Sequence, residues 1–270
     1  MIQSVTRSTE ARALTYLSRS PYLNVFLKHV LLHDPEAPAR KNVAVALADE
    51  RVIGVAYCGR QLAIAAEPEA IAAFGEYVKR HRGERMILGQ RDTVRAFWEA
   101  VRKWHVPPRL VRDRQLVMAI DRPRLRPYER STNVRHARID EWSAVADGSA
   151  EMIRHELAYD PRLRSPEFAE GIRQMIEREL WWIGETNGRL CFFCNVGPWC
   201  DRTVQLQGIW SPPAMRGRGL ATASLAAICD RLLDASPTLS LYVNDFNEAA
   251  IALYRRVGFE HVGDFQTILF

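Results

Sequence analysis

Apolar and polar residues alternate along the chain in two periods, and this alternation predicts strands and helices in nearly regular succession. In the first part, period-two runs such as Val43 to Ala48 and Val52 to Cys58 predict strands, joined here by the polar turn Asp49 to Arg51. Apolar residues between Glu69 and His81 recur at the spacing of one helical face. The expected elements are strands at 43–48, 52–58, 86–88 and 116–120 and helices at 69–81 and 93–103, the second capped by Asp92.

The same rhythm returns in the second part. Asn187-Gly188 between two apolar runs is a strong signal for a hairpin. Ser165, followed by Pro166 and Glu167, is typical of a helix start. The expected elements are helices at 139–156, 165–179, 220–235 and 247–257 and strands at 181–185, 190–196, 203–210 and 239–243, with a last strand ending at Phe270.

A proline- and arginine-rich stretch, residues 122–127, separates the two parts. Because prolines at this density continue neither helix nor sheet, we predict two domains, at residues 1–125 and 130–270. The fold class is α/β with a mixed sheet. Both parts contain a strand, a polar turn ending in arginine and a second strand, which favours a duplicated fold. The alternative is that any mixed α/β chain contains such hairpins.

Composition places the chain among soluble globular proteins. Apolar residues make up 47% and charged residues 26% of the 270 residues, which suffices for a sizeable core. No apolar run reaches the roughly 20 residues of a membrane helix. The chain start, with Arg7, Glu10 and Arg12, lacks the layout of a signal peptide. We therefore expect a cytoplasmic protein with no membrane partner.

Charge and cysteines exclude two further classes. The net charge of +5 comes from scattered arginines, whereas nucleic-acid binding needs a focused basic face, so no nucleic-acid partner is expected. Cys191 and Cys194 form a C-x-x-C within an expected strand. Residues three apart on a strand point to opposite faces, so we interpret these thiols as core residues and expect no metal.

The segment from Gly208 to Ala221 carries the most specific chemistry. It reads as the end of a strand, a turn rich in glycine and arginine, and the start of an amphipathic helix. Glycines allow a ligand to approach the backbone closely, and the free N–H groups at a helix start favour an anion. Arg216 and Arg218 add positive charge. This combination predicts a pyrophosphate site.

Two motifs resemble those of the GNAT acetyltransferases. Arg216, Gly219 and Ala221 fill the family's Q/R-x-x-G-x-G/A signature, and Asn247 to Phe259 resembles its N-x-x-A-x-x-x-Y-x-x-x-G-F segment. The C-terminal run looks like bacterial GNAT proteins that carry an N-terminal DUF4081 domain. The resemblance implies a GNAT fold in the C-terminal half and a GNAT-like, degenerate first half, because no glycine-arginine turn follows the first-half hairpin.

The resemblance further implies direct transfer of an acetyl group from acetyl-CoA to the amine of a small-molecule or protein acceptor. Strand N–H groups near Ile209 and Ser211 would hold the pantetheine arm, and Asn247 would contact it. Tyr254 would protonate the departing thiolate, although an ordinary packed aromatic is the alternative. The implied cofactor-binding residues are Ile209, Trp210, Ser211, Arg216, Gly217, Arg218, Gly219, Leu220, Ala221, Thr222, Asn247 and Tyr254.

The general base is less clearly marked. Many relatives use a glutamate on the strand before the turn, where this chain has Gln205 and Gln207. Either Gln207 holds a water or a base comes from elsewhere, and Glu156 is our candidate, ahead of His155. Because this carboxylate is missing, a non-catalytic acyl-CoA sensor remains the alternative function. Four tryptophans either line an acceptor pocket or pack in the core, and they are Trp181, Trp182, Trp199 and Trp210. A homodimer is compatible with this interpretation.

Overall fold

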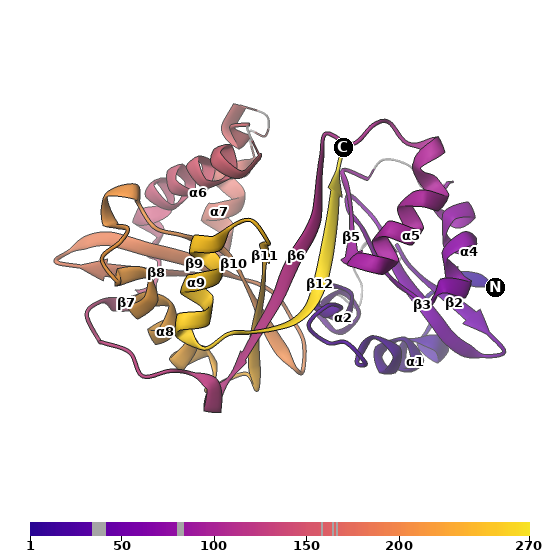
Figure 1. The fold of residues 1–270 in the computed structure, drawn as a ribbon, viewed down its shortest axis with the longest axis horizontal. Coiled ribbons are helices and arrows are strands. Elements are labelled where there is room, and N and C mark those ends of the chain that lie inside the picture. The colour runs from indigo at the N-terminus through magenta and orange to yellow at the C-terminus, as the bar shows by residue number, and fades with distance from the viewer. Residues whose placement is uncertain (34–41, 80–83, 158, 164, 166) are drawn as a thin grey trace.

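The first half of the chain forms one layer of strands with helices on both sides (Figure 1). The computed structural model describes residues 1–33, 42–79, 84–157, 159–163, 165 and 167–270. The first-half elements are β1 (Ile2–Ser4), α1 (Arg7–Leu17), α2 (Val25–His33), β2 (Val43–Ala48), β3 (Arg51–Cys58), β4 (Leu62–Ala66), α4 (Pro68–Val78), β5 (Met86–Gln90), α5 (Arg91–Val101) and β6 (Leu110–Asp121).

The second half repeats this order of elements. After a short strand, two helices precede three consecutive antiparallel strands, and then helices and strands alternate to the end. The elements are β7 (Asn133–His136), α6 (Trp142–Leu157), α7 (Phe168–Glu177), β8 (Trp181–Thr186), β9 (Arg189–Trp199), β10 (Thr203–Trp210), α8 (Leu220–Leu232), β11 (Thr238–Asn244), α9 (Glu248–Val257) and β12 (Glu260–Leu269).

The described strands form one mixed sheet in which the two halves exchange a strand. The order is β1-β2-β3-β4-β5-β12-β6-β11-β10-β9-β8-β7. Strand β12 of the second half pairs with β5 of the first, whereas β6 of the first half pairs with β11 of the second. The two exchanged strands also pair with each other, and Figure 1 shows them side by side between the two groups of helices. The fold is therefore a tandem whose halves complete each other.

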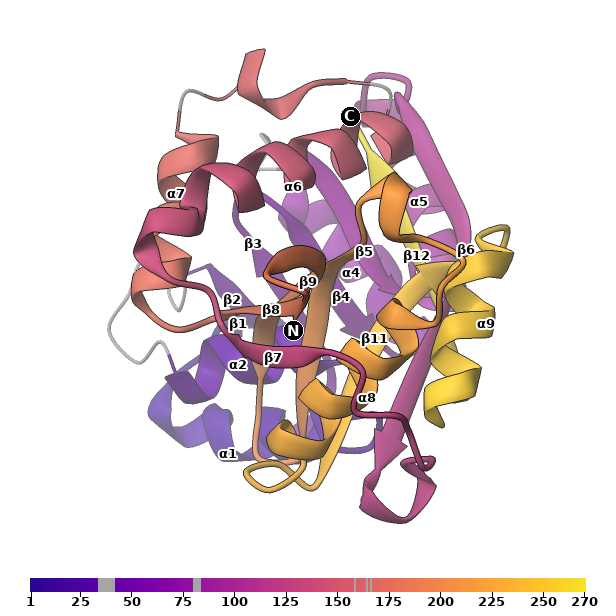
Figure 2. The same cartoon turned by 90° about the vertical axis from the view of Figure 1, so that its left-hand side faces the viewer.

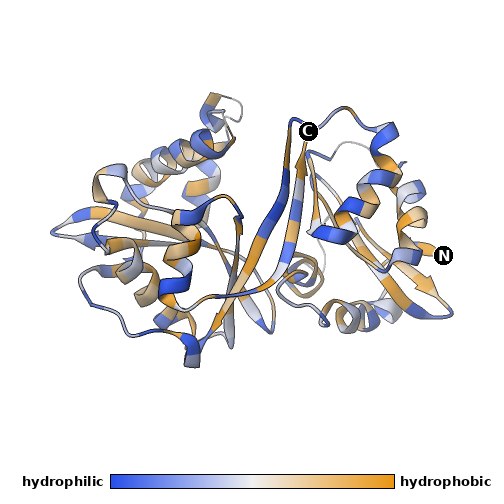
Figure 3. Cartoon of the chain, in the orientation of Figure 1, coloured by the Kyte–Doolittle hydropathy of each residue, from blue (hydrophilic) through white to orange (hydrophobic). Residues whose placement is uncertain are grey.

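Helices cover both faces of the sheet, as the alternation of strand side chains requires. In the second half, Phe192 packs toward α8 and α9, while its neighbour Phe193 packs toward α6 and α7 (Figure 2). In the first half, Ala44 and Ala46 face α4 and α5, and the intervening Val45 faces α1 and α2. Figure 3 shows apolar strands between helices that carry polar residues as well. This packing places α6 and α8 on opposite faces of the sheet.

A second contact joins the halves at helix α2. Lys28, whose side chain is 3% exposed, forms an ion pair with Asp201 at 2.6 Å and donates to Ser18 Oγ at 2.9 Å. The next residue, His29, accepts through Nδ1 from the backbone N–H of Trp199 at 3.2 Å, and the two rings lie 4.3 Å apart. Trp199 is thus part of the contact between the halves.

The structure agrees with the local predictions in most elements and corrects several boundaries. The strand expected at 203–210 has these bounds, whereas β6 is longer than expected because it pairs along its length with β12 or β11. Asp92 does not cap α5, since the helix begins at Arg91 with Gln90 before it. Helix α7 begins at Phe168, later than Ser165. His81 and Pro166 lie outside the described residues.

The thiols of Cys191 and Cys194 are free and fully buried. Burial raises the pKa of both thiols, so they stay protonated at neutral pH. Across the residues that the structure describes, no cluster of three or more His, Cys, Asp or Glu side chains is placed to hold a metal ion. In the same part of the chain, no helix has both the length and the apolar character needed to cross a bilayer.

Candidate functional site

The parallel strands β10 and β11 separate at their carboxyl ends. They pair only from Thr203–Gln205 with Thr238–Ser240. Beyond that point β10 still pairs with β9, and β11 still pairs with β6. The edges of β10 and β11 that face each other therefore have no strand partner among the described residues. A register shift between Gln207 and Trp210 further distorts β10. The gap leaves backbone groups available to a ligand.

Gly208 explains the distortion of β10. Its φ of +59° lies in the left-handed region that favours glycine. A Cβ there would lie 2.6 Å from Asn195 Oδ1, so a side chain would not fit. After this residue, Ile209 packs toward α8 and α9, whereas Trp210 packs toward α6 and α7. The end of β10 therefore presents one side chain to each face of the sheet.

The turn between β10 and α8 is built to receive a group close to its backbone. Gly217 has φ +71° and Gly219, at the N-cap of α8, has φ +76°. No described atom lies within 4 Å of the place where either Cβ would be. The buried hydroxyl of Ser211 has no hydrogen-bond partner among the described residues. An unfilled helix start beside an unpartnered hydroxyl suits the phosphates and arm of a bound ligand.

The arginines of this turn take different positions. Arg216 donates through Nε to the carbonyl of Ser211 at 3.0 Å, which fixes the turn. Arg218 lines a hollow of about 290 Å³ together with Arg126 from the stretch between the halves and Arg256 from α9. Further residues along this hollow are Pro127, Tyr128, Glu129, Ser131, Gly219, Thr222, Ala223, Ala226 and Val257. We call it the basic hollow. Its three arginines make it suited to binding anions.

Tyr254 and Asn247 lie at opposite ends of α9. Asn247 is the N-cap, and its side chain accepts from the N–H of Ala250 at 3.2 Å. Tyr254 is 6% exposed, and no hydrogen bond reaches its hydroxyl within the described ranges. Burial raises its pKa strongly, and the charge of Glu156 adds to the shift. The phenol is therefore protonated at neutral pH.

The charge of Glu156 at the end of α6 acts on Tyr254 of α9, although the two helices are far apart in the chain. The charge of Glu156 also contributes to raising the pKa of Tyr242 on β11, where burial is the main cause. Glu156 forms an ion pair with Arg112 Nη2 at 3.0 Å. Because Arg112 belongs to the exchanged strand β6, the first half helps to fix a carboxylate of the second. His155 is exposed, and Gln207 donates to Gln205 Oε1 at 2.9 Å.

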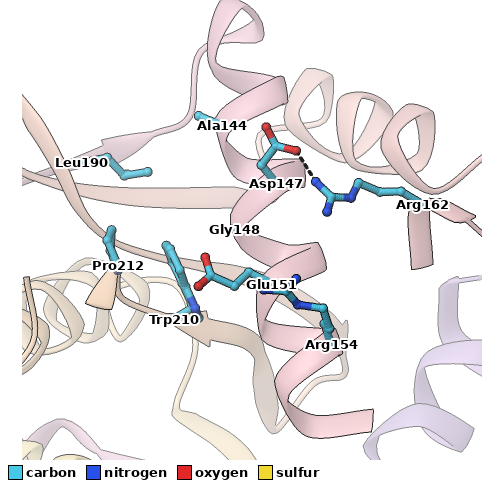
Figure 4. Close-up of a pocket in the computed structure, with 9 residues that line it drawn as sticks. All are labelled: Ala144, Asp147, Gly148, Glu151, Arg154, Arg162, Leu190, Trp210 and Pro212. Atoms are coloured by element: carbon cyan, nitrogen blue, oxygen red, sulfur yellow. Dashed lines mark hydrogen bonds and ion pairs between the residues drawn. The ribbon is translucent and has the colours of Figure 1, made fainter. Parts of the chain in front are cut away.

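A second hollow, of about 350 Å³, lies between α6 and the end of β10 (Figure 4). We call it the α6 hollow. Trp210 and Pro212 form one wall, and α6 passes so close that a Cβ on Gly148 would lie 3.0 Å from Trp210. Figure 4 shows Glu151 extending from α6 toward Trp210. The remaining lining residues are Ala144, Asp147, Arg154, Arg162 and Leu190.

The polar residues of the α6 hollow were not among the site residues expected from the sequence motifs. Residues 144, 147, 148, 151 and 154 recur three or four apart, so they share one face of a helix. That spacing was a usable signal, but the sequence does not show that this face lies against Trp210. Of the tryptophans considered, Trp210 lines this hollow, Trp181 and Trp182 are buried in the core, and Trp199 packs on His29.

Among its described residues, the first half has no equivalent of the glycine-arginine turn. Strand β4 ends at Ala66, and α4 begins at Pro68. Strands β4 and β5 stay close, since a Cβ on Gly89 would lie 2.3 Å from the carbonyl oxygen of Ile64. The expected degenerate character of the first half therefore has a structural basis.

Family comparisons find two matches along the chain. Residues 149–259 match the acetyltransferase (GNAT) family, and residues 43–145 match a domain of unknown function, DUF4081. The resemblance inferred from the motifs is thus confirmed for both parts of the chain. The DUF4081 match extends past the proposed domain boundary at residues 125–130.

Similar proteins share part of the sequence or the whole fold. A mycothiol acetyltransferase of Acidimicrobium ferrooxidans is 38% identical over 94 residues, which cover 31% of this chain and 30% of that protein. A Drosophila protein of known structure has a TM-score of 0.68 at 12% identity and covers 100% of this chain and 98% of its own. A tandem GNAT protein from the clavulanic acid biosynthesis pathway has a TM-score of 0.55 at 15% identity, covering 99% and 98%. At these identities the two structures establish the fold alone.

Proposed function

We propose that the chain transfers an acetyl group from acetyl-CoA to an amine, because residues 149–259 match the GNAT acetyltransferase family. The observation that carries the proposal is the turn after β10, where Gly217 and Gly219 leave open space over the start of α8. In this proposal the N–H groups of Leu220, Ala221 and Thr222 face the pyrophosphate. Arg218 and the other arginines of the basic hollow face the remaining phosphate charge.

The separated strands would hold the reactive end of the donor. The unpaired edge of β10 near Ile209 and Ser211 offers N–H groups to the pantetheine arm and the thioester carbonyl. Ser211 Oγ, buried without a partner in the described part of the chain, would find one in this arm. Asn247 would contribute mainly by starting α9, because its side chain already accepts from Ala250.

The chemistry requires one proton to leave and another to arrive. The amine nitrogen bonds to the acetyl carbon while the carbon–sulfur bond breaks, so the nitrogen loses a proton and the thiolate gains one. We propose that Glu156, held by Arg112, takes the first proton, directly or through water. Tyr254, protonated because burial raises its pKa, donates to the thiolate.

The test has two steps. Calorimetric titration should detect binding of acetyl-CoA, and a free-thiol assay should then detect CoA release that increases with added amine. The absence of a carboxylate on β10, where Gln205 and Gln207 bond to each other, favours a non-catalytic acyl-CoA sensor as the second candidate. A sensor binds acetyl-CoA without amine-dependent release of thiol, so the second step separates the two functions.

A further inference from the structure

The α6 hollow opens on the side of β10 opposite to the basic hollow. Trp210 and Pro212 line the first, whereas Arg218, Gly219 and Thr222 from the start of α8 line the second. The adjacent residues Ile209 and Trp210 pack on opposite faces of the sheet. A molecule in the α6 hollow would therefore reach the end of β10 without competing for the turn that we assign to phosphates.

The charges in the α6 hollow sum to zero but are unequally engaged. Asp147 is paired with Arg162 at 2.7 Å, and Arg162 also pairs with Asp160. Neither Glu151 nor Arg154 forms a hydrogen bond or ion pair within the residues that the structure describes. The charge of Arg154 does contribute to lowering the pKa of Asp160, after the larger effect of Arg162. Residues three apart on a helix lie about 5–6 Å from each other. The wall therefore offers one carboxylate and one guanidinium within reach of a single small molecule.

We propose that the α6 hollow holds the acceptor, and that the acceptor is a free amino acid with an apolar side chain; this inference rests on the proposed function. Glu151 receives the ammonium group, Arg154 receives the carboxylate, and the apolar side chain lies against Trp210, Leu190 and Pro212. A volume of about 350 Å³ suits a small molecule. A polyamine would leave Arg154 without a partner, and a phosphorylated amine would bring a charge of about −2 to the single guanidinium of Arg154.

Transfer then follows the chemistry of the proposed function. Glu151 holds the acceptor as its ammonium form, and one ammonium proton passes to water before the attack. As the nitrogen–carbon bond forms and the carbon–sulfur bond breaks, the nitrogen loses its second proton to Glu156 and Tyr254 protonates the thiolate, so the products are an N-acetyl amino acid and CoA. The carboxylate on Arg154 is unchanged throughout. Its contact with Arg154 therefore affects the affinity for the acceptor, which can be measured independently of turnover.

The experiment compares L-leucine with L-leucinamide, which lacks only the carboxylate charge. Each is titrated calorimetrically into protein saturated with CoA, and each is also offered with acetyl-CoA in the thiol assay. We expect leucine to bind at least about tenfold more tightly than leucinamide. Arg154→Gln should abolish this difference by weakening leucine alone, and Glu151→Gln should weaken both. Arg173→Gln, which removes a partly exposed arginine of α7 outside the hollow, should change neither.

The outcomes separate this inference from the proposed function. Leucine binding with the expected Arg154 dependence but without thiol release would support the site and contradict the acetyl transfer. Thiol release with spermidine but with neither leucine nor leucinamide would support the transfer and overturn the amino-acid assignment. Equal binding of leucine and leucinamide, equal losses in Arg154→Gln, or no binding of either compound would also overturn it.

Discussion

At the scale of single residues, the site depends on groups whose environment differs from that of a free side chain. Tyr254 lies in the core that β9, β11, α8 and α9 share, and burial holds its hydroxyl in the protonated form. Glu156 lies at the end of α6, held by Arg112 of the other half. Their proximity could not be predicted from the sequence, because it depends on how α6, α9 and β6 pack. The motif alone marked Tyr254.

Replacing Tyr254 with phenylalanine should lower the turnover number by roughly 100-fold, because only the proton donor is removed. The ring that packs near Phe259 remains, so the affinity for acetyl-CoA should stay within about twofold. Steady-state kinetics and calorimetry measure the two effects. Tyr16→Phe, which removes a half-buried phenol in the first half, is the matched control. Unchanged turnover in Tyr254→Phe would leave Tyr254 as a packing residue.

Replacing Glu156 with glutamine should change the pH dependence of the rate. A carboxylate base works only when ionised, so protonation at acid pH should slow the wild-type enzyme. The variant lacks this group, so its acid limb should be less steep, set by the acceptor amine alone, at a much lower rate. The measurement is the rate between about pH 4 and 8, at saturating acetyl-CoA. An acid limb identical to that of the wild type would return the role of base to water or to another residue.

At the scale of elements, the sequence predicted the run from β10 to α9 well. Glycine-arginine turns, helix starts and period-two strands are local features, and each of these elements packs against its neighbours in the chain. The face of α6 was different, since its polar residues at helical spacing equally suit a solvent-exposed face. Only the packing of Gly148 against Phe193 and Trp210 shows that this face borders a hollow.

Replacing Gly219 with alanine should separate ligand binding from stability. Its φ of +76° makes any side chain unfavourable, by about 1 kcal/mol, and the added Cβ would occupy the open space above the turn. We expect a small loss of stability and at least about a tenfold loss of affinity for acetyl-CoA. Gly188→Ala is the control, because Gly188 has φ +70° and equally open surroundings in the β8–β9 hairpin.

Thermal unfolding should therefore show similar destabilisation in the two glycine variants, whereas calorimetry should show weaker acetyl-CoA binding in Gly219→Ala alone. Equal affinities in both variants would place the phosphates elsewhere. Loss of binding in both would indicate that the strain of the backbone, not the space above the turn, controls the affinity.

At the scale of the whole molecule, buried thiols should make stability decrease at alkaline pH. Burial raises the pKa of Cys58 to about 12 and also raises that of Cys194 and Cys229. Unfolded thiols ionise near pH 8.5, while the native ones keep their protons. The unfolded state therefore binds fewer protons, and the free energy of unfolding falls as pH rises above about 8.5.

Each of these thiols should lower the free energy of unfolding by up to about 1.4 kcal/mol per pH unit in that range. Urea unfolding at a series of alkaline pH values measures the slope. Cys58→Ala should reduce the slope, whatever it does to stability at neutral pH. A slope that is the same with and without the Cys58 thiol would contradict the assignment.

The strand exchange is the feature of the whole molecule that the sequence did not reveal. Both halves contain the right elements, but the apolar pattern of β6 or β12 does not show which half supplies its neighbours. Strands far apart in the chain become partners only in the complete fold. The division at residues 125–130 stays a prediction, and it now describes two segments that share one sheet.

Sharing one sheet implies that neither half folds alone. A segment of residues 126–270 would lack β6, which lies between β11 and β12, and would expose the edges of both strands. A segment of residues 1–125 would lack β12, which lies between β5 and β6. We therefore expect each segment to aggregate when expressed alone, and both together to form a soluble one-to-one complex that binds acetyl-CoA. Size-exclusion chromatography and circular dichroism measure this. A monomeric, folded second segment with full affinity would show that the exchange is dispensable, because β11 and β12 would then have paired without β6.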